Sequence, residues 1–209
     1  MPLYKTIIVN KTTEVFIWKI EESYDDLSKG ITLSRNSQER VVNMKSDLHK
    51  RGFMSVRHLL GEFGYVDSDL FYDELGKPHL TDGKYISITH SFNFSAIIVS
   101  DNIHVGVDIE KQRDKIVKIA HKFTPFEAYK TVANHEALVR KLTIVWGAKE
   151  SLYKIYEQEG LSFLRHIDID DFYFDTAQTS GTITFKGNIS NYTVHFLEFE
   201  GFTCVYALQ

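Results

Sequence analysis

Acidic side chains alternate with apolar ones in the segment Gly106-Val107-Asp108-Ile109-Glu110. On a strand, Asp108 and Glu110 share one face, while Val107 and Ile109 share the other. Gly106 leaves room for a close neighbour beside the two carboxylates. Hard oxygen ligands of this kind suit Mg²⁺, which takes one or two carboxylates together with substrate phosphates and water. An ordinary half-exposed strand with its polar side chains outward has the same pattern.

A second charged motif, W-G-A-K-E-S-L-Y-K, runs from Trp146 to Lys154. On a helix, Glu150 and Lys154 lie one turn apart, in the order that favours an ion pair. An exposed pair of this kind adds little to stability. The functional interpretation is that Glu150 supplies a third carboxylate for phosphate chemistry, with a lysine one turn further along. Trp146 is expected to pack in the core rather than to take part in catalysis.

Positive charge is concentrated between residues 35 and 57, whereas the whole chain of 209 residues carries a net charge of −4. The basic residues of this segment are Arg35, Arg40, Lys45, Lys50, Arg51 and Arg57, against Glu39 and Asp47. The net acidity of the chain argues against a protein built mainly to hold nucleic acid, but it allows a local basic pocket. The segment is therefore either a solvated helix face or a surface that binds an anion.

Composition places the chain among ordinary globular proteins, with 43% apolar and 25% charged residues. Cys204 is the only cysteine, which excludes an intrachain disulfide and a cysteine metal cluster. No run of about 18 apolar residues predicts a transmembrane helix, and the first residues lack the apolar run of a signal peptide. The glycine motifs of P-loop and dinucleotide-binding proteins are absent. We expect a cytoplasmic protein with no nucleic acid or membrane partner.

The elements that must position these residues are predicted from hydrophobic periodicity. Apolar residues three and four apart predict one amphipathic helix over 37–63, with Gly52 on its apolar face, close to a neighbouring helix or a ligand. A second helix is expected to begin at the cap Thr124, and a third to span 142–157. The segment 67–80 is predicted to be a loop. Alternating apolar residues predict strands over 6–9, 14–20, 85–90, 96–100, 103–110, 182–186, 192–197 and 202–206.

This order of elements predicts an α+β fold made of two similar halves, each a small antiparallel sheet packed with helices. A turn at Asp101 and Asn102 lies near the middle of the chain. No linker rich in proline or serine separates the halves. We therefore expect the halves to span 1–101 and 102–209.

The two motifs G-V-D-x-E and W-x-x-K-E-S-x-x-K together resemble the signature of the 4′-phosphopantetheinyl transferases. Upstream, G-K-P at 76–78 resembles a motif of that family, and S-I-T-H-S at 87–91 resembles its S-x-S-H-S segment, with Thr89 in place of a serine. The basic residues at 50–57 resemble its basic helix. The resemblance covers the chain from about residue 35 to residue 165.

Two subgroups of that family differ in length. In the short holo-acyl-carrier-protein synthase type the aspartate lies near the N-terminus and the chains form trimers, whereas Asp108 lies in the middle of this chain. This position resembles the longer type, typified by the activator of surfactin synthetase. The resemblance implies a monomer in which a pseudo-two-fold pair of halves shares an active site at the interface.

The resemblance also implies a reaction. The family transfers the 4′-phosphopantetheine group of coenzyme A to a serine of an apo acyl or peptidyl carrier protein, giving the holo carrier and 3′,5′-ADP. Asp108, Glu110 and Glu150 would hold Mg²⁺, or Mn²⁺, as a Lewis acid at the pyrophosphate. Asp108, Glu150 and Lys154 would be catalytic. Glu150, directly or through a metal-bound water, would take the serine proton, and Lys154 would stabilise charge on the leaving phosphate or protonate it.

Coenzyme A, as co-substrate, would bind mainly to the N-terminal half. A guanidinium such as that of Arg51 suits the 3′-phosphate, while Lys77 and His90 suit the other nucleotide phosphates. The full set of expected contacts is Arg51, Arg57, Lys77, Pro78, Thr89, His90, Ser91 and Lys154. The basic segment 35–57 could serve coenzyme A, the carrier protein, or both.

Two other classes of function are compatible with these residues. A metal-dependent phosphohydrolase could use the same carboxylates on a small substrate, and an inactive module could bind coenzyme A or a carrier protein without transfer. The inactive module is disfavoured because the three carboxylates and Lys154 are all present. The sequence does not distinguish among the carrier proteins of fatty acid, polyketide, nonribosomal peptide and lysine biosynthesis.

Overall fold

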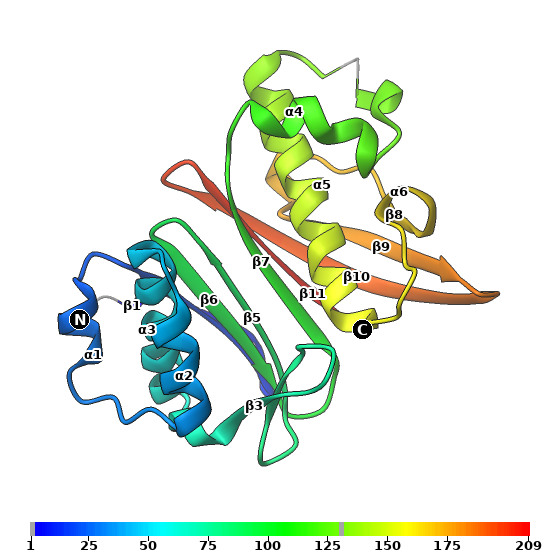
Figure 1. The fold of residues 1–209 in the computed structure, drawn as a ribbon. Coiled ribbons are helices and arrows are strands. Elements are labelled where there is room, and N and C mark those ends of the chain that lie inside the picture. Colours follow the sequence, from blue (N-terminus) through cyan, green and yellow to red (C-terminus); the bar gives the residue numbers. More distant parts are fainter. Residues whose placement is uncertain (1–2, 130–131) are drawn as a thin grey trace. The chain divides into compact units, whose positions relative to one another are not determined.

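The computed structural model describes residues 3–129 and 132–209, and the chain forms two compact units, Met1–Ile103 and His104–Gln209. Figure 1 shows that each unit contains its own sheet with helices against it. The predicted α+β fold of small antiparallel sheets packed with helices is therefore confirmed. Among the helices of the described residues, none is long and apolar enough to cross a bilayer.

The N-terminal unit is built on a four-stranded antiparallel sheet in the order β1-β2-β6-β5. Its strands are β1 (Leu3–Asn10), β2 (Thr13–Lys19), β5 (Tyr85–Ser91) and β6 (Phe94–Ser100), and its helices are α1 (Tyr24–Ser28), α2 (Arg35–Asn43) and α3 (Asp47–Glu62). The longest helix, α3, packs on one face of the sheet, where Phe16 stacks on Phe63 and Trp18 stacks on His58. Large rings bury much apolar area per residue, so these contacts hold the helix to the sheet.

The helix predicted over 37–63 is two helices. The first, α2, ends at Asn43, and Met44 takes an extended conformation. Ser46 then caps α3, because its side chain accepts a hydrogen bond from the backbone N–H of His49. The apolar residues keep a helical spacing on both sides of this break, so periodicity alone does not reveal it.

The segment 67–80, predicted to be a loop, contains a short hairpin. A 3₁₀ turn, η1 (Asp67–Asp69), leads into β3 (Leu70–Tyr72), which pairs with β4 (Pro78–Leu80). The carboxylate of Asp73 accepts hydrogen bonds from the backbone N–H groups of Leu75 and Lys77. An aspartate in this role organises a tight turn, and here it closes the hairpin.

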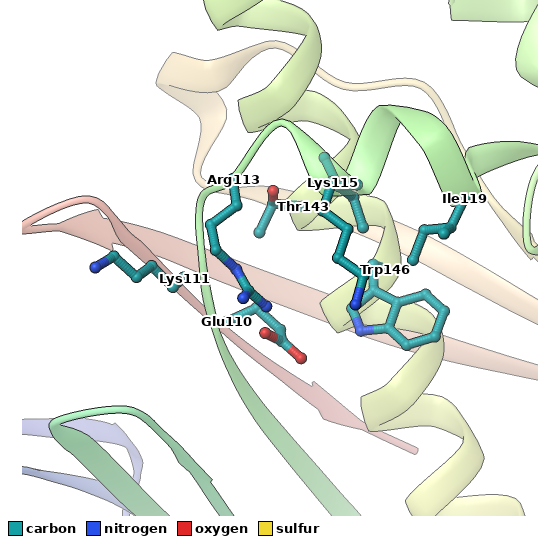
Figure 2. Close-up of a pocket in the computed structure, with 8 residues that line it drawn as sticks. Glu110, Lys111, Arg113, Lys115, Ile119, Thr143 and Trp146 are labelled. Atoms are coloured by element: carbon teal, nitrogen blue, oxygen red, sulfur yellow. The ribbon is translucent and has the colours of Figure 1, made fainter.

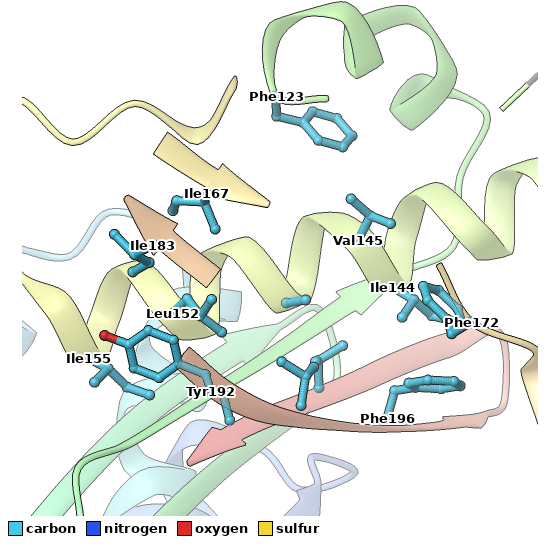
Figure 3. Close-up of a cluster of buried hydrophobic side chains, with 14 of the residues drawn as sticks. Phe123, Ile144, Val145, Leu152, Ile155, Ile167, Phe172, Ile183, Tyr192 and Phe196 are labelled. Carbon is cyan, nitrogen blue, oxygen red and sulfur yellow. The ribbon is translucent and has the colours of Figure 1, made fainter. Parts of the chain in front are cut away.

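The C-terminal unit has a five-stranded antiparallel sheet in the order β7-β11-β10-β9-β8. Its strands are β7 (Val105–Lys111), β8 (Ile167–Ile169), β9 (Gln178–Phe185), β10 (Asn188–Phe199) and β11 (Phe202–Leu208). Its helices are α4 (Lys115–Ile119), α5 (His135–Tyr156) and α6 (Phe163–His166), with 3₁₀ turns η2 (Ala120–Lys122), η3 (Phe126–Tyr129) and η4 (Phe174–Thr176). Figure 3 shows the core of this unit, where Val145 and Leu152 of α5 pack among Ile183, Tyr192 and Phe196 of the sheet.

The helix start predicted at Thr124 is wrong for the described residues. Only the 3₁₀ turn η3 follows this cap, and residues 130–131 of the predicted helix lie outside the described residues. The long helix α5 begins later, at His135, where the side chain of Asn134 accepts a hydrogen bond from the N–H of Ala137. The capping sequence at Thr124 therefore precedes only a 3₁₀ turn, whereas Asn134, ten residues later, caps the helix.

The two units repeat one order of elements. In each, a strand is followed by a long helix and then by an antiparallel hairpin whose second strand pairs with the first: β2, α3, β5 and β6 in one unit, and β7, α5, β10 and β11 in the other. The side chains that face the helix differ. On β2 they are the rings of Phe16 and Trp18, whereas on β7 they include Asp108.

Candidate active site

The strand β7 and the helix α5 approach each other closely at Gly106. A Cβ atom on this residue would lie 2.0 Å from the backbone oxygen of Ser151 in α5, which no real side chain tolerates. Gly106 therefore leaves room for a packed helix, not for a ligand. Because side chains alternate along a strand, Asp108 and Glu110 point to the same side as Gly106, toward α5. The predicted common face of the two carboxylates is confirmed.

One stripe of α5 faces these carboxylates. Trp146, Glu150 and Lys154 are spaced four residues apart, so they lie on one side of the helix. The Trp146 ring packs against Phe123 and Phe163, with ring centroids 5.0 and 5.5 Å apart, and its indole donates a hydrogen bond to Glu110. Trp146 is thus half-buried and packs against the core, in agreement with the predicted packing role, and it also orients one carboxylate.

Lys154 links the helix to the strand. Its ammonium donates hydrogen bonds to the backbone oxygen of Val107 at 2.7 Å and to a carboxylate oxygen of Asp108 at 3.0 Å. The Asp108 side chain is 9% exposed and that of Lys154 is 29% exposed. A charge-assisted hydrogen bond in such a partly buried place is stronger than one on an open surface. The predicted neighbour of Lys154 on the helix was Glu150, but its ion pair in this structure is with Asp108.

The three carboxylates influence one another. Burial and the negative charge of Asp108 raise the pKa of Glu150 to about 7, and Lys154 opposes this only in part. Burial and the charge of Asp108 also raise the pKa of Glu110, against the hydrogen bond from Trp146 and the charge of Arg113. Desolvated carboxylates that repel one another in this way favour a neighbouring positive charge.

The donor atoms of this acidic cluster, defined as Asp108, Glu110 and Glu150, fit a hard cation in kind, since carboxylate oxygens are the ligands that Mg²⁺ takes. The structure does not assemble them into a finished site. Within 3–129 and 132–209, no three His, Cys, Asp or Glu side chains form a group that could hold a metal ion. Here the ammonium of Lys154 supplies the positive charge beside Asp108.

A small pocket of about 120 Å³ adjoins Glu110 in the same unit. Figure 2 shows Arg113 and Glu110 pointing toward one another, with Trp146 beside them. The pocket is lined by Glu110, Lys111, Arg113, Lys115, Ile116, Ile119, Thr143 and Trp146. Positive side chains thus gather next to the acidic cluster, as a site for phosphate oxygens requires.

The N-terminal unit has a second pocket, of about 250 Å³, which we call the histidine pocket. Its lining residues are Arg40, Met44, His49, Gly52, Phe53, Val56, Arg57, Tyr72, Ile88 and His90. The guanidinium of Arg40 lies over the ring of Tyr72, 4.3 Å from its centroid. The rings of His49 and His90 meet edge to face at 6.0 Å. Exposed cationic and aromatic groups around one pocket suit a nucleotide phosphate and its base.

Arg57, predicted to contact coenzyme A, has a different role in the structure. Its side chain is 3% exposed and forms an ion pair with Asp67, whose side chain is fully buried, at 2.7 Å. It also donates hydrogen bonds to Ser37 and to the backbone oxygen of Phe53. We therefore remove Arg57 from the expected coenzyme A contacts, because its guanidinium is surrounded by partners from its own unit.

The other predicted coenzyme A contacts differ in whether they line the histidine pocket. Along β5, His90 lies on the face of α3 and lines the histidine pocket, whereas Thr89 and Ser91, as strand neighbours, point to the opposite face. Arg51 donates a hydrogen bond to the backbone oxygen of Ile20 at 3.1 Å and does not line the pocket.

Lys77 and Pro78 reach the histidine pocket only indirectly. Lys77 lies in the turn of the β3–β4 hairpin and Pro78 is the first residue of β4, where it pairs with Tyr72, which lines the pocket. Of the coenzyme A contacts predicted in this unit, His90 and Arg57 line the histidine pocket. Because Arg57 is paired with Asp67, His90 is the one that remains.

Sequence reasoning missed His49 and Tyr72 of the histidine pocket, and it included Arg40 only as one of the residues of the basic segment. Arg40 lies in the basic segment and His49 lies three residues before Gly52, but neither belongs to a motif. Tyr72 lies in the short hairpin that was predicted to be a loop. The basic segment was the available signal for Arg40, whereas the folding of two distant segments brings Tyr72 into place.

The C-terminal unit matches the model of the 4′-phosphopantetheinyl transferase superfamily over residues 104–207. No curated protein matches the chain significantly. The matched residues include the acidic cluster, Lys154 and, except for Leu208, the sheet that supports them. Geometry and family comparison therefore point to the same half of the molecule. Through this unit, the chain is similar to the 4′-phosphopantetheinyl transferase superfamily.

Proposed function

We propose that this protein transfers the 4′-phosphopantetheine group from coenzyme A to a serine of an apo acyl or peptidyl carrier protein, giving the holo carrier and 3′,5′-ADP. The observation that carries the proposal is the acidic cluster beside Lys154 in the unit that matches the superfamily. A separate N-terminal unit with its own sheet supports the longer, single-chain type of enzyme.

The reaction forms a bond between the carrier serine oxygen and the phosphorus next to pantetheine, and it breaks the pyrophosphate bond to 3′,5′-ADP. The serine proton must leave as the new bond forms, and we assign its acceptance to Glu150, which is half-buried beside Asp108. Negative charge develops on the leaving phosphate oxygen. Lys154, whose ammonium Asp108 holds at 3.0 Å, stabilises that charge.

A divalent cation, Mg²⁺ or Mn²⁺, would be held by Asp108, Glu110 and Glu150. When bound, it would act as a Lewis acid that neutralises the pyrophosphate oxygens. The side chains of this unit prepare for it in two ways. Trp146 orients Glu110 through a hydrogen bond, and Lys154 fixes Asp108.

The nucleotide of coenzyme A is assigned to the histidine pocket of the N-terminal unit. Arg40 supplies a positive group and His90 a ring N–H for its phosphates, and Tyr72 and His49 supply rings beside them. The carrier protein is proposed to be an acyl or peptidyl carrier without further distinction, because the described side chains carry no feature that selects one pathway.

Mass spectrometry of an apo carrier protein tests the proposal. With coenzyme A and Mg²⁺, the wild-type enzyme should add one phosphopantetheine group, and Glu150→Gln should add it at least about a hundredfold more slowly. Asp175→Asn, which changes an exposed carboxylate of the same unit, is the control and should act as the wild type. Phosphate release from small substrates without carrier modification would indicate a phosphohydrolase, and binding alone an inactive module. Either result would contradict the proposal.

A further inference from the structure

Helix α3 lies unusually close to strand β5 at Gly52. A Cβ atom on Gly52 would lie 2.7 Å from Cδ2 and 3.2 Å from Cγ of the His90 ring. The first distance is shorter than real Cβ contacts, so any side chain at this position must move the ring. The sequence predicted a close neighbour at Gly52, either a helix or a ligand, and the structure identifies it as a pocket histidine.

A buried chain of hydroxyl groups fixes this approach. The hydroxyl of Ser55 donates to the backbone oxygen of Gly52 at 2.8 Å, and it lies 2.8 Å from the hydroxyl of Ser95. Since the Ser55 proton is used on Gly52, Ser95 donates to Ser55. Both serines are fully buried, and Ser95 is the register partner of His90. These hydrogen bonds thus hold the helix close to the sheet at the point where His90 projects.

We propose that Gly52 is a positioning residue that sets the His90 ring in the histidine pocket to bind a phosphate of coenzyme A. The inference rests on the proposed function, because it takes coenzyme A as the ligand of that pocket. Gly52 itself touches no substrate. It acts by leaving the space that the His90 ring occupies. This ring lies next to His49, which is in α3 with Gly52.

A positioning role for Gly52 predicts a loss of binding without a loss of folding. His90 is exposed, so its ring can rotate away from an added methyl group without opening the core. Alanine is also a better helix former than glycine. Gly52→Ala should therefore fold as well as the wild type, yet its displaced His90 should bind a phosphate poorly.

Gly61 offers a matched control. It lies in the same helix, and a Cβ atom there would meet nothing within 4 Å. We expect Gly52→Ala to weaken coenzyme A binding, measured by isothermal titration calorimetry, by about tenfold, the loss of one charge-assisted hydrogen bond. KM for coenzyme A should rise by a similar factor with kcat unchanged, while Gly61→Ala should match the wild type in both assays.

The double variant Gly52→Ala/His90→Ala shows whether Gly52 acts through His90. His90→Ala alone should weaken binding by about tenfold, and adding Gly52→Ala should cause no further loss. If the double variant shows the product of the two single losses of affinity, the inference is wrong. Wild-type affinity in folded Gly52→Ala or in His90→Ala would also overturn it. If the wild type binds coenzyme A but does not modify the carrier, the proposed function fails while the role of Gly52 stands or falls on the calorimetry.

Discussion

Lys154 connects the chemistry of the acidic cluster to its architecture. One ammonium binds the Val107 backbone and the Asp108 carboxylate, so it holds the strand and balances a negative charge at once. A neutral side chain at 154 would lose the charge for the leaving phosphate and would leave Asp108 beside Glu150 without compensation. Its removal should therefore affect the rate far more than the fold.

Lys154→Met is expected to lower kcat for carrier modification by about 10²- to 10³-fold, the usual effect of removing one group that stabilises developing charge. Circular dichroism should remain that of the wild type, because the methionine keeps most of the apolar stem. The measurement is steady-state transfer to an apo carrier protein. A folded Lys154→Met enzyme with wild-type kcat would remove Lys154 from the mechanism.

Asp67 is expected to make the N-terminal unit sensitive to acid. Although burial alone would raise its pKa, hydrogen bonds from Ser34 and the pairing with Arg57 hold the pKa of Asp67 below its usual value. A lowered folded pKa contributes stability that is present above the unfolded pKa, near 3.8, and is lost as pH falls through the lower folded value.

Asp67→Asn should therefore reduce the free energy of unfolding by about 3 kcal/mol near neutral pH, because it leaves Arg57 buried without its partner charge. Below pH 4 the difference from the wild type should shrink. Urea unfolding at several pH values measures both effects. If the free energy of unfolding of Asp67→Asn stays below that of the wild type by a constant amount down to pH 2, ionisation of Asp67 does not stabilise the fold.

The roles of single side chains were only partly predictable from the sequence. The alternation of β7 was enough to place Asp108 and Glu110 on one face. Nothing in the sequence links Arg57 to Asp67, since the pair forms only when η1 folds back onto α3. Lys149 is similar: it lies inside the second motif, yet its buried ammonium donates to the backbone oxygens of Phe163 and Ile167 and holds the chain after α5.

Packing between β7 and α5 controls how the acidic cluster is assembled. Two glycines let α5 pack closely on the sheet, Gly106 in β7 and Gly147 in the helix, but they meet different obstacles. A Cβ atom on Gly106 would meet the backbone of Ser151, whereas one on Gly147 would meet Cγ2 of Val205, in β11, at 2.8 Å. A side chain can rotate, while a helix backbone must move as a whole.

Gly106→Ala is consequently expected to destabilise the protein by about 3 kcal/mol and to lower transfer activity, since it pushes the strand with Asp108 away from Glu150. Gly147→Ala is the matched comparison and should cost clearly less. Thermal unfolding and the transfer assay measure the two effects. Equal stability of both variants would contradict the close approach at Gly106.

Sequence patterns predicted strands better than helix boundaries. The longer strands have runs of apolar and β-branched residues bounded by glycine or asparagine turns, which local chemistry determines. Helix ends depend on a competition between caps: Ser46 interrupts a continuous apolar stripe, and Thr124 has a capping sequence that yields only a 3₁₀ turn. The β3–β4 hairpin was missed because three-residue strands are too short to show alternation.

The proposed steps of binding and transfer fall in different units. The histidine pocket belongs to the N-terminal unit, and the acidic cluster belongs to the C-terminal unit. Binding of coenzyme A and transfer of its group should therefore respond to different substitutions. The sequence predicted two halves, but it did not predict which residues of each half would share a pocket.

Variants of the two units should separate in steady-state kinetics. His90→Ala should raise KM for coenzyme A by about tenfold with little change in kcat, because it removes binding of the ground state and transition state alike. Glu150→Gln should lower kcat with little change in KM. The reverse assignment, with kcat lost in His90→Ala and KM raised in Glu150→Gln, would contradict this division.

Metal removal should stop the enzyme without unfolding it. EDTA should abolish carrier modification and Mg²⁺ should restore it, because the acidic cluster needs a positive charge to hold a pyrophosphate. Mg²⁺ should also raise the melting temperature of the wild type but not of Glu150→Gln. Transfer that continues in EDTA would contradict the assignment of the three carboxylates as ligands.

The repeated order of elements in the two units also determines stoichiometry. Where β7 presents Asp108 to its helix, β2 presents Phe16 and Trp18, so within the described residues the repeat carries its carboxylates only once. A titration with Mn²⁺ should saturate at one equivalent per chain along a simple hyperbola. As a proposed monomer with one such site, each molecule should complete its turnovers independently of any other, so the activity per chain should not change on dilution.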